Sequence, residues 1–280
     1  MPRGWQWDET LYHGSAPFYV RGRLPYAPEL AGRLATALSP DGHGRLIDVG
    51  CGPGVLTLTL AHLFAEAIGV DPDPGMLAEA ERRAAAAGLS NLRWVRARAE
   101  ELPARLGTFQ VATFGQSFHW MDRPRVAALI FCLLEPGGAF VQVADVKEER
   151  AATGQGLPNP KPPYAAIGDL VRRYLGPIPR AGQGLLRHGT PDGEAAVLEA
   201  AGFAAPERLR VPDARTLNRT ADDVVAWVYS RAGSAPHLFG NRGDAFETDL
   251  RQLLRDAAPS GQFAEQPPDT EVVIWRTPRR

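Results

Sequence analysis

The sequence predicts an α/β fold in which helices cover both faces of a mostly parallel sheet. Short apolar segments alternate with longer amphipathic ones over the first half of the chain, a pattern typical of strands joined by crossover helices. A glycine-rich turn follows the first apolar segment, at residues 50–54. Right-handed crossovers bring the loops that follow parallel strands to one edge of the sheet, so we expect the functional site at that edge.

Size and composition are those of an ordinary globular protein. The chain has 280 residues, enough for one domain with a large core. Hydrophobic residues make up 44% of it and charged residues 22%. The formal net charge of −1 gives no general attraction to nucleic acid or to an anionic membrane, so we expect neither as a partner.

The cysteines and the N-terminal segment bear on the cellular setting. Cys51 and Cys132 have no partner at metal-ligand spacing, so we expect reduced thiols and no metal site. No apolar run approaches the ~20 residues that cross a bilayer. Residues 1–10 also lack the apolar region of a signal peptide. We therefore expect a cytoplasmic protein, acting as a monomer or homodimer.

The first half of the chain reads as five strands and four helices. We expect the strands at residues 45–50, 66–70, 92–95, 109–114 and 139–146. We expect the helices at residues 28–38, 55–64, 74–87 and 123–134. Asp73 can cap the third helix, with Pro74 in its first turn, and Gly88 ends it.

The organisation changes at Lys147. Residues 147–189 are rich in glycine, proline and arginine and contain one amphipathic piece, at 164–175. This segment is too poor in apolar residues to hold a core of its own, so we expect a lid inserted over the active edge. The later helices are expected at residues 194–201, 221–231 and 244–257. We therefore predict a single domain over residues 1–280, with an N-terminal arm at 1–26 and the lid at 147–189.

The glycine turn has the composition of a ligand-binding loop. Asp48 lies in the strand before it, and Gly50, Gly52 and Gly54 follow at every second position. Glycine has no Cβ, so it takes positive φ and lets a ligand approach the main chain. The spacing is G-x-G-x-G rather than the G-x-G-x-x-G of dinucleotide sites. A nicotinamide or flavin site, or a turn with no ligand, stays open as an alternative.

Asp71 closes the second strand, about 20 residues after the glycine turn. A carboxylate at that place suits a ribose because it accepts hydrogen bonds from both hydroxyl groups. The alternative is an aspartate that only caps a helix or a turn.

Together these residues resemble motif I and the ribose acid of the class I S-adenosylmethionine (SAM)-dependent methyltransferases. Residues 114–120, Phe-Gly-Gln-Ser-Phe-His-Trp, resemble a segment of the small-molecule methyltransferases related to the trans-aconitate and biotin-pathway carboxyl methyltransferases. The resemblance implies a Rossmann-like, doubly wound sheet of seven strands, whose last two, at 208–216 and 272–275, form an antiparallel end. It also implies SAM as cofactor and S-adenosylhomocysteine as product. Asp48 and the three glycines would hold the amino-acid end of the cofactor, and Asp71 with Pro72 its ribose.

Residues 96–103 resemble the family's adenine-contacting segment. The matching positions are Ala99, Glu100, Leu102 and Pro103. The resemblance implies that Ala99 and Glu100 contact the cofactor, while Arg98 stands where the family usually has an acid. An acid that merely starts a helix is the alternative for Glu100.

Residues 114–120 resemble a loop that lies in relatives between the cofactor and the substrate. Gly115 and Gln116 would lie beside the methionine part of SAM, and Trp120 would face the substrate. His119 is the candidate catalytic base, because an imidazole titrates near pH ~6.5. The alternative is that His119 forms hydrogen bonds within the loop and shapes the pocket, because methyl transfer to a carboxylate needs no base.

The segment at residues 19–30 resembles the family's N-terminal entry segment, which folds over the cofactor in relatives. Tyr19 and Arg23 are the expected cofactor contacts, with the arginine pairing bidentately with the carboxylate. Tyr26 is expected to face the substrate. The alternative is a solvated arm.

The resemblance implies transfer of a methyl group from SAM to an oxygen or nitrogen of a small-molecule acceptor. Many relatives serve natural-product pathways. Four lid arginines suggest an anionic substrate, although they could also form a solvated face: Arg172, Arg173, Arg180 and Arg187. Two other functions remain open, a methyltransferase of RNA or protein and a SAM-binding protein that does not methylate.

Overall fold

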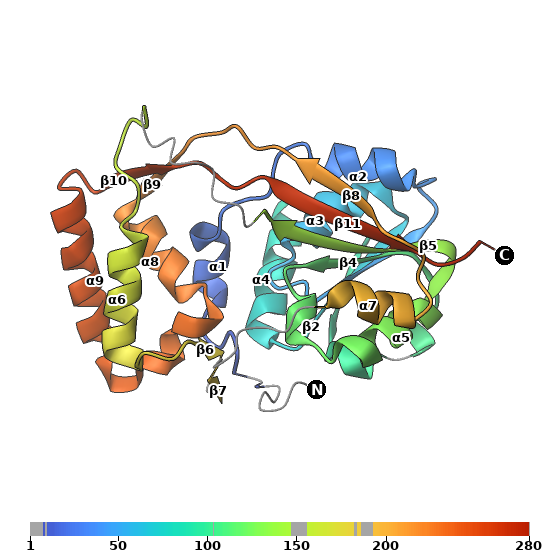
Figure 1. Cartoon of the computed structure of the whole chain (residues 1–280), viewed down its shortest axis with the longest axis horizontal. Helices are drawn as coiled ribbons and strands as arrows, with labels where there is room; N and C mark the ends of the chain where they lie inside the picture. The colour runs from blue at the N-terminus through green and yellow to red at the C-terminus, as the bar shows by residue number, and fades with distance from the viewer. Residues whose placement is uncertain are drawn as a thin grey trace.

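A seven-stranded sheet forms the centre of the molecule (Figure 1). The computed structural model describes residues 8, 10–102, 104–146, 156–181, 184–185 and 193–279. The order across the sheet is β3-β2-β1-β4-β5-β11-β8. The strands are β1 (Arg45–Val49), β2 (Glu66–Asp71), β3 (Leu92–Arg96), β4 (Phe109–Gly115), β5 (Leu134–Asp145), β8 (Glu207–Val211) and β11 (Thr270–Arg276).

The predicted mixed sheet with an antiparallel end is confirmed. The first five strands pair in parallel, and β11 runs antiparallel to both of its neighbours, β5 and β8. The strand predicted at 208–216 ends at Val211 instead. Pro212 follows, and a proline has no N–H to donate to a strand ladder, so the pairing stops there.

Helices cover both faces of the sheet, as predicted for a doubly wound fold. They are α2 (Leu30–Leu38), α3 (Val55–Leu60), α4 (Pro74–Ala86), α5 (Arg123–Leu133) and α7 (Glu194–Ala200). Side chains alternate along β1, so that Leu46 packs with α2 and α3 while Ile47 packs with α5 and α7. The predicted helix cap is also present, because Asp73 accepts hydrogen bonds from the first-turn amides of α4, at Gly75 (2.7 Å) and Met76 (3.1 Å).

A second group of helices lies beside the sheet, on the left in Figure 1. It consists of α6 (Tyr164–Leu175), α8 (Ala221–Tyr229) and α9 (Gly243–Ala257), with the paired strands β9 (Leu217–Thr220) and β10 (Gln262–Glu265), and α1 (Ala16–Gly22) of the N-terminal arm packs against it. We call this group the helical cap. Sequence analysis did not predict α1, β9 or β10. None of the helices within the described ranges is long and apolar enough to cross a lipid bilayer.

The helical cap has an apolar core of its own. Ile167 and Leu170 of α6 are buried there against Val224 of α8 and Phe246 and Leu250 of α9. The predicted lid segment therefore does not stand over the sheet alone, because its helix shares a core with helices from the C-terminal part of the chain. Residues 147–155, 182–183 and 186–189 of that segment lie outside the described residues.

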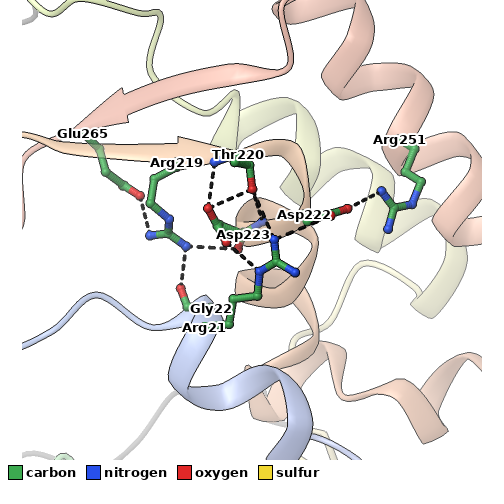
Figure 2. A network of polar contacts seen from close by, with 8 residues as sticks. All are labelled: Arg21, Gly22, Arg219, Thr220, Asp222, Asp223, Arg251 and Glu265. Carbon is green, nitrogen blue, oxygen red and sulfur yellow. Dashed lines mark hydrogen bonds and ion pairs between the residues drawn. The ribbon is translucent and has the colours of Figure 1, made fainter.

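The N-terminal arm is joined to the cap by a buried ion pair (Figure 2). Arg219 donates a hydrogen bond to Glu265 (2.8 Å) and another to the backbone oxygen of Gly22 at the end of α1 (2.8 Å). Tyr164 of α6 donates to the other carboxylate oxygen of Glu265 (2.5 Å). Arg21 of α1 adds a contact with Asp223 of α8 (2.6 Å). Four segments that are far apart in sequence therefore meet at one point.

Helices α1 and α8 also touch backbone to backbone at Gly22. A Cβ at this position would lie 2.3 Å from the backbone oxygen of Ala226, closer than any real Cβ contact. The arm can therefore dock on the cap only with glycine at this position.

We predict that Gly22→Ala lowers the free energy of unfolding by about 1–3 kcal/mol, because a methyl group forced into a packed contact shifts the backbone. Urea unfolding followed by circular dichroism measures the change. Gly32→Ala is the matched control, because its added Cβ meets nothing within 4 Å and helix propensity favours alanine. Equal stabilities for Gly22→Ala and the wild type would contradict the close contact.

Candidate functional site

A cavity opens at the carboxyl edge of the sheet, where the loops after β1, β2, β3 and β4 meet the N-terminal arm. Of the predicted site residues, those that line it are Tyr19, Gly50, Gly52, Asp71, Pro72, Ala99, Glu100, Gly115, Gln116 and Trp120. The predicted residues that do not line it are Arg23, Tyr26, Asp48, Gly54 and His119. The structure thus brings together residues from five separate segments of the sequence.

The glycine turn has the backbone that its sequence predicts. Gly50, Gly52 and Gly54 have φ values of +70°, +53° and +72°, all in the left-handed region that favours glycine. Their surroundings differ, however. A Cβ on Gly54 would lie 2.8 Å from the ring of Trp94, whereas a Cβ on Gly52 would meet nothing within 4 Å. Gly52 is therefore the glycine with open space for a ligand, and Gly54 serves the packing beneath the turn.

Asp71 lies on the cavity wall at the end of β2. Its two carboxylate oxygens accept hydrogen bonds from the amides of Gly52 (2.8 Å) and Asp73 (2.9 Å). Burial raises the pKa of Asp71 to about 7, and these two amides oppose the shift. A carboxylate oxygen has two lone pairs, so each keeps acceptor capacity for a hydroxyl group.

Asp48 is buried behind the glycine turn rather than exposed to the cavity. Its carboxylate accepts hydrogen bonds from the hydroxyl groups of Thr57 in α3 (2.5 Å) and Thr113 in β4 (2.9 Å). Burial raises its pKa to about 6, and the two hydroxyl groups oppose the shift. Asp48 therefore connects the strand before the turn to the helix after it and to the neighbouring strand.

The predicted adenine segment forms the short 3₁₀ helix η2 (Ala99–Glu101). Glu100 is buried, and its carboxylate accepts a hydrogen bond from the backbone amide of Asp122 (2.8 Å). It therefore fixes the segment to the residue that caps α5. Arg98, which replaces the usual acid, lines the cavity with its Nε 3.6 Å from Glu100. Pro103 lies outside the described residues.

The loop after β4 combines backbone strain with rigid support. Gln116 has a φ of +51°, a left-handed conformation that is uncommon for a residue other than glycine. The 3₁₀ helix η4 (Phe118–Trp120) follows it, and Phe118 packs edge-on against Phe114 and Phe140, with ring centroids 5.2 and 5.1 Å away. The side chain of Gln116 bridges two further groups, the carboxyl of Asp145 and the hydroxyl of Tyr26. Strained residues held in this way cluster at functional sites.

In the same loop, Trp120 lies on the cavity wall and His119 lies beside it. The two rings are 4.7 Å apart, and His119 does not line the cavity. Among the two interpretations of His119, this arrangement favours the one in which the imidazole shapes the pocket.

Two residues of the N-terminal arm line the cavity without having been predicted, Leu11 and Tyr12. The hydroxyl of Tyr12 has a hydrogen bond with Trp120, and burial raises its pKa to about 12. The ring of Tyr12 lies 6.0 Å from that of Tyr19. The arm therefore forms one wall of the cavity. The apolar pair in an otherwise polar segment was the available signal for these two residues.

The lid arginines lie elsewhere. Arg172 pairs with Asp169 on the exposed face of α6, and Arg180 donates a hydrogen bond to the backbone oxygen of Leu175. Arg173 is exposed on the same helix, and Arg187 lies outside the described residues. The three arginines that the structure describes are absent from the cavity wall, so they do not carry the argument for an anionic substrate.

Comparison with known sequences gives the family. Residues 46–138 match the family model described as a methyltransferase domain. An uncharacterized methyltransferase of Mycobacterium bovis is 33% identical over 144 residues, which are 51% of this chain and 56% of that protein. The trans-aconitate 2-methyltransferase of Deinococcus radiodurans is 29% identical over 202 residues, which are 71% of this chain and 66% of that protein. The chain thus spans about half the length of the first of these relatives.

Solved structures give the same fold. The YcgJ protein from Bacillus subtilis has a TM-score of 0.51 at 18% identity, covering 89% of this chain and 98% of that one. The [4+2]-cyclase SpnF has a TM-score of 0.50 at 21% identity, covering 90% and 82%. The domain match and the methyltransferase relatives support the class I SAM-dependent methyltransferases that the motifs predicted, and the solved structures show the same fold.

We predict that Asp48→Asn changes how stability depends on pH. The pKa of Asp48, about 6, lies above the 3.8 of an ordinary aspartate, so the folded protein holds this proton more tightly than the unfolded chain. The contribution of this carboxyl group to the free energy of unfolding is therefore lost as the pH rises from about 4 to 6. Asparagine does not titrate, so the stability of Asp48→Asn should rise relative to the wild type across that interval, by an amount on the order of 1–3 kcal/mol.

Urea unfolding at each pH from 4 to 8 measures this difference. The exposed Asp169→Asn is the matched control for loss of one carboxylate. Parallel curves for Asp48→Asn and the wild type would contradict the buried, proton-binding carboxyl.

Proposed function

We propose that this protein transfers a methyl group from SAM to an oxygen or nitrogen of a small-molecule acceptor. The observation that carries the proposal is the cavity in which the open side of Gly52, the carboxylate of Asp71 and the loop of Gln116 and Trp120 face one space. A bound SAM supplies a methyl group already activated by its positive sulfur, so the protein has mainly to bind, orient and exclude water.

The residues of the cavity fit this cofactor in two respects. Asp71 is a buried carboxylate with unused acceptor capacity, which suits the two hydroxyl groups of a ribose. Gly52 leaves room for a ligand to reach the main chain. We assign Asp71 and Pro72 to the ribose, Ala99 to the adenine, and the Gly50 and Gly52 region to the amino-acid end. Asp48 acts behind the cavity and Glu100 on its wall, where their carboxylates hold the glycine turn and the adenine segment in place.

Aromatic side chains would exclude water from the reacting groups. Tyr12, Tyr19 and Trp120 line the cavity, and the hydrogen bond between Tyr12 and Trp120 joins the arm to the loop. Desolvation of this kind strengthens every polar interaction inside a site. In this proposal His119 positions Trp120, and Tyr26 acts through Gln116.

Methyl transfer is tested with isotopically labelled SAM and a panel of small acids, amines and phenols, analysed by mass spectrometry. Small carboxylic acids including trans-aconitate come first, because a relative carries that name. We expect one acceptor to gain a single labelled methyl group while S-adenosylhomocysteine accumulates. Total RNA and a protein extract serve as parallel acceptors, and labelling of either instead would favour the RNA or protein alternative.

A cofactor that binds without any transfer would favour a protein that does not methylate. A [4+2]-cyclase shares this fold, and a fold alone does not determine a reaction. Failure of SAM and S-adenosylhomocysteine to bind at all would remove the proposal.

We predict that binding of the nucleoside part weakens as Asp71 gains a proton. The pKa of Asp71 is about 7 and the carboxylate is the form that accepts from hydroxyl groups, so affinity should fall about tenfold from pH 8 to pH 6. The probe is 5′-methylthioadenosine, which has the ribose and adenine but no amino acid group that titrates in this range. Asp71→Asn should bind about 10- to 100-fold more weakly at pH 8, and with little dependence on pH. Calorimetry at pH 6, 7 and 8 measures both, and equal slopes for the two proteins would exclude Asp71 from the ribose site.

A further inference from the structure

One basic side chain stands among acids on the cavity wall. Of the described residues that line the cavity, Arg98 is the only basic one, and three are acids, Asp71, Asp73 and Glu100. The amide of Ala97, the residue before Arg98, donates a hydrogen bond to the backbone oxygen of Asp71 (3.3 Å). Arg98 therefore lies next to the end of β2, where Asp71 lines the same cavity.

Two carboxylates hold the guanidinium of Arg98. Its Nε lies 3.6 Å from Oε2 of Glu100, and its Nη1 lies 3.8 Å from Oε1 of Glu101. Glu100 is itself fixed, because its Oε1 accepts a hydrogen bond from the backbone amide of Asp122 (2.8 Å). Only 32% of the Arg98 side chain is exposed. The guanidinium is therefore held at the cavity wall rather than extended into solvent.

The position of Arg98 determines which ligand groups suit this part of the wall. A guanidinium has five N–H donors and no acceptor. Glu100 directs one oxygen to the amide of Asp122 and the other toward Arg98. A ligand group that meets Arg98 must therefore accept a hydrogen bond, and a group that can only donate is disfavoured there.

Purine bases differ in the group that they would present to such a wall. Adenine has an amino group on C6, which is a hydrogen-bond donor, whereas a 6-oxopurine has a carbonyl oxygen there, which is an acceptor. In the function proposed above, the ribose binds Asp71 and the base lies along the segment that contains Ala99. An amino group beside Arg98 would set two donors against each other, whereas a carbonyl oxygen would accept from the guanidinium.

We propose that Arg98 determines the base specificity of this site, and that the site accepts a 6-oxopurine nucleoside at least as well as an adenine nucleoside. The proposal rests on the proposed function, because it assigns Arg98 to the base of a nucleoside whose ribose binds Asp71. Arg98 is then a specificity-determining residue. It favours the carbonyl oxygen by donation and disfavours the amino group by the lack of an acceptor.

Isothermal titration calorimetry with two nucleosides tests the proposal. S-adenosylhomocysteine and S-inosylhomocysteine have the same ribose and amino acid and differ in the base, which carries an amino group in the first and an oxo group in the second. Each is titrated into the wild type, Arg98→Asp and Arg93→Gln. Arg93 is an exposed arginine of β3 that pairs with Glu66 and does not line the cavity, so its variant is the control for loss of one positive charge.

The ratio of the two dissociation constants is the measured quantity. We expect S-inosylhomocysteine to bind the wild type and Arg93→Gln no more than about threefold more weakly than S-adenosylhomocysteine does. Arg98→Asp should instead prefer S-adenosylhomocysteine by about tenfold or more, because a carboxylate accepts from the amino group and repels the carbonyl oxygen.

Two further variants separate hydrogen bonding from a merely structural role. Arg98→Lys keeps the charge and the donor character, so its ratio should stay close to that of the wild type. Arg98→Asn is neutral and has an oxygen that accepts, so its ratio should move in the same direction as that of Arg98→Asp. Arg98→Asn also keeps the test decisive if Arg98→Asp folds poorly beside Glu100 and Glu101.

The proposal is overturned if the wild type prefers S-adenosylhomocysteine by more than about threefold. It is also overturned if the wild type, Arg98→Asp and Arg98→Asn give the same ratio, or if Arg98→Lys changes the ratio as much as Arg98→Asp does. Binding of S-adenosylhomocysteine alone defeats this proposal and leaves the proposed function intact. If neither nucleoside binds the wild type, the proposed function fails and the base assignment fails with it.

Discussion

The buried pair of Arg219 and Glu265 is a contact on which the position of the N-terminal arm depends. Arg219 reaches the end of α1 through the backbone oxygen of Gly22, and Glu265 receives the hydroxyl of Tyr164 from α6. The arm is also held on the cap by a buried hydrogen bond from the hydroxyl of Ser15 to the backbone oxygen of Tyr229 and by the ring of Phe18, whose centroid lies 5.0 Å from that of Tyr229. The arm supplies Tyr12 and Tyr19 to the cavity wall, so the pair helps to hold that wall in place.

The pair is also satisfied in the way that a buried ion pair requires. Besides Glu265, Arg219 donates to two backbone oxygens, at Gly22 and Asp223. Desolvation makes a buried ion pair a weak source of net stability, but removal of one partner leaves an uncompensated charge. Such a pair therefore selects one arrangement of the segments more than it adds to their total stability. In this protein the selected arrangement is an arm docked between the cap and the sheet.

The parts of the structure predicted from sequence are those set by local residues. The strands β1 to β5 and the helices between them follow from short periodic patterns, and the glycine turn and the acid at Asp71 are local motifs. What could not be predicted depends on pairing between distant segments. Strands β9 and β10 are four residues each and pair only with one another, across about forty intervening residues. The helix α1 is short and is held by contacts with α8 rather than by its own sequence.

The site also combines features that local sequence predicts with features that depend on contacts between distant segments. The motif predicts an acid at Asp48, but not that Thr57 and Thr113 occupy both of its oxygens. That outcome depends on which face of β1 and β4 meets α3, and this is a property of the folded sheet. The arginines of the insertion are close in sequence, but those that the structure describes do not line the cavity.

The left-handed backbone of Gln116 has a consequence for the order in which the site loosens. A residue of this kind stores on the order of 1–3 kcal/mol, which its surroundings must hold in place. Its amide bridges Tyr26 and Asp145, so one local relaxation frees a phenol and a carboxyl at the same moment. On heating, this side of the cavity should therefore lose its shape while the sheet beneath it is still intact.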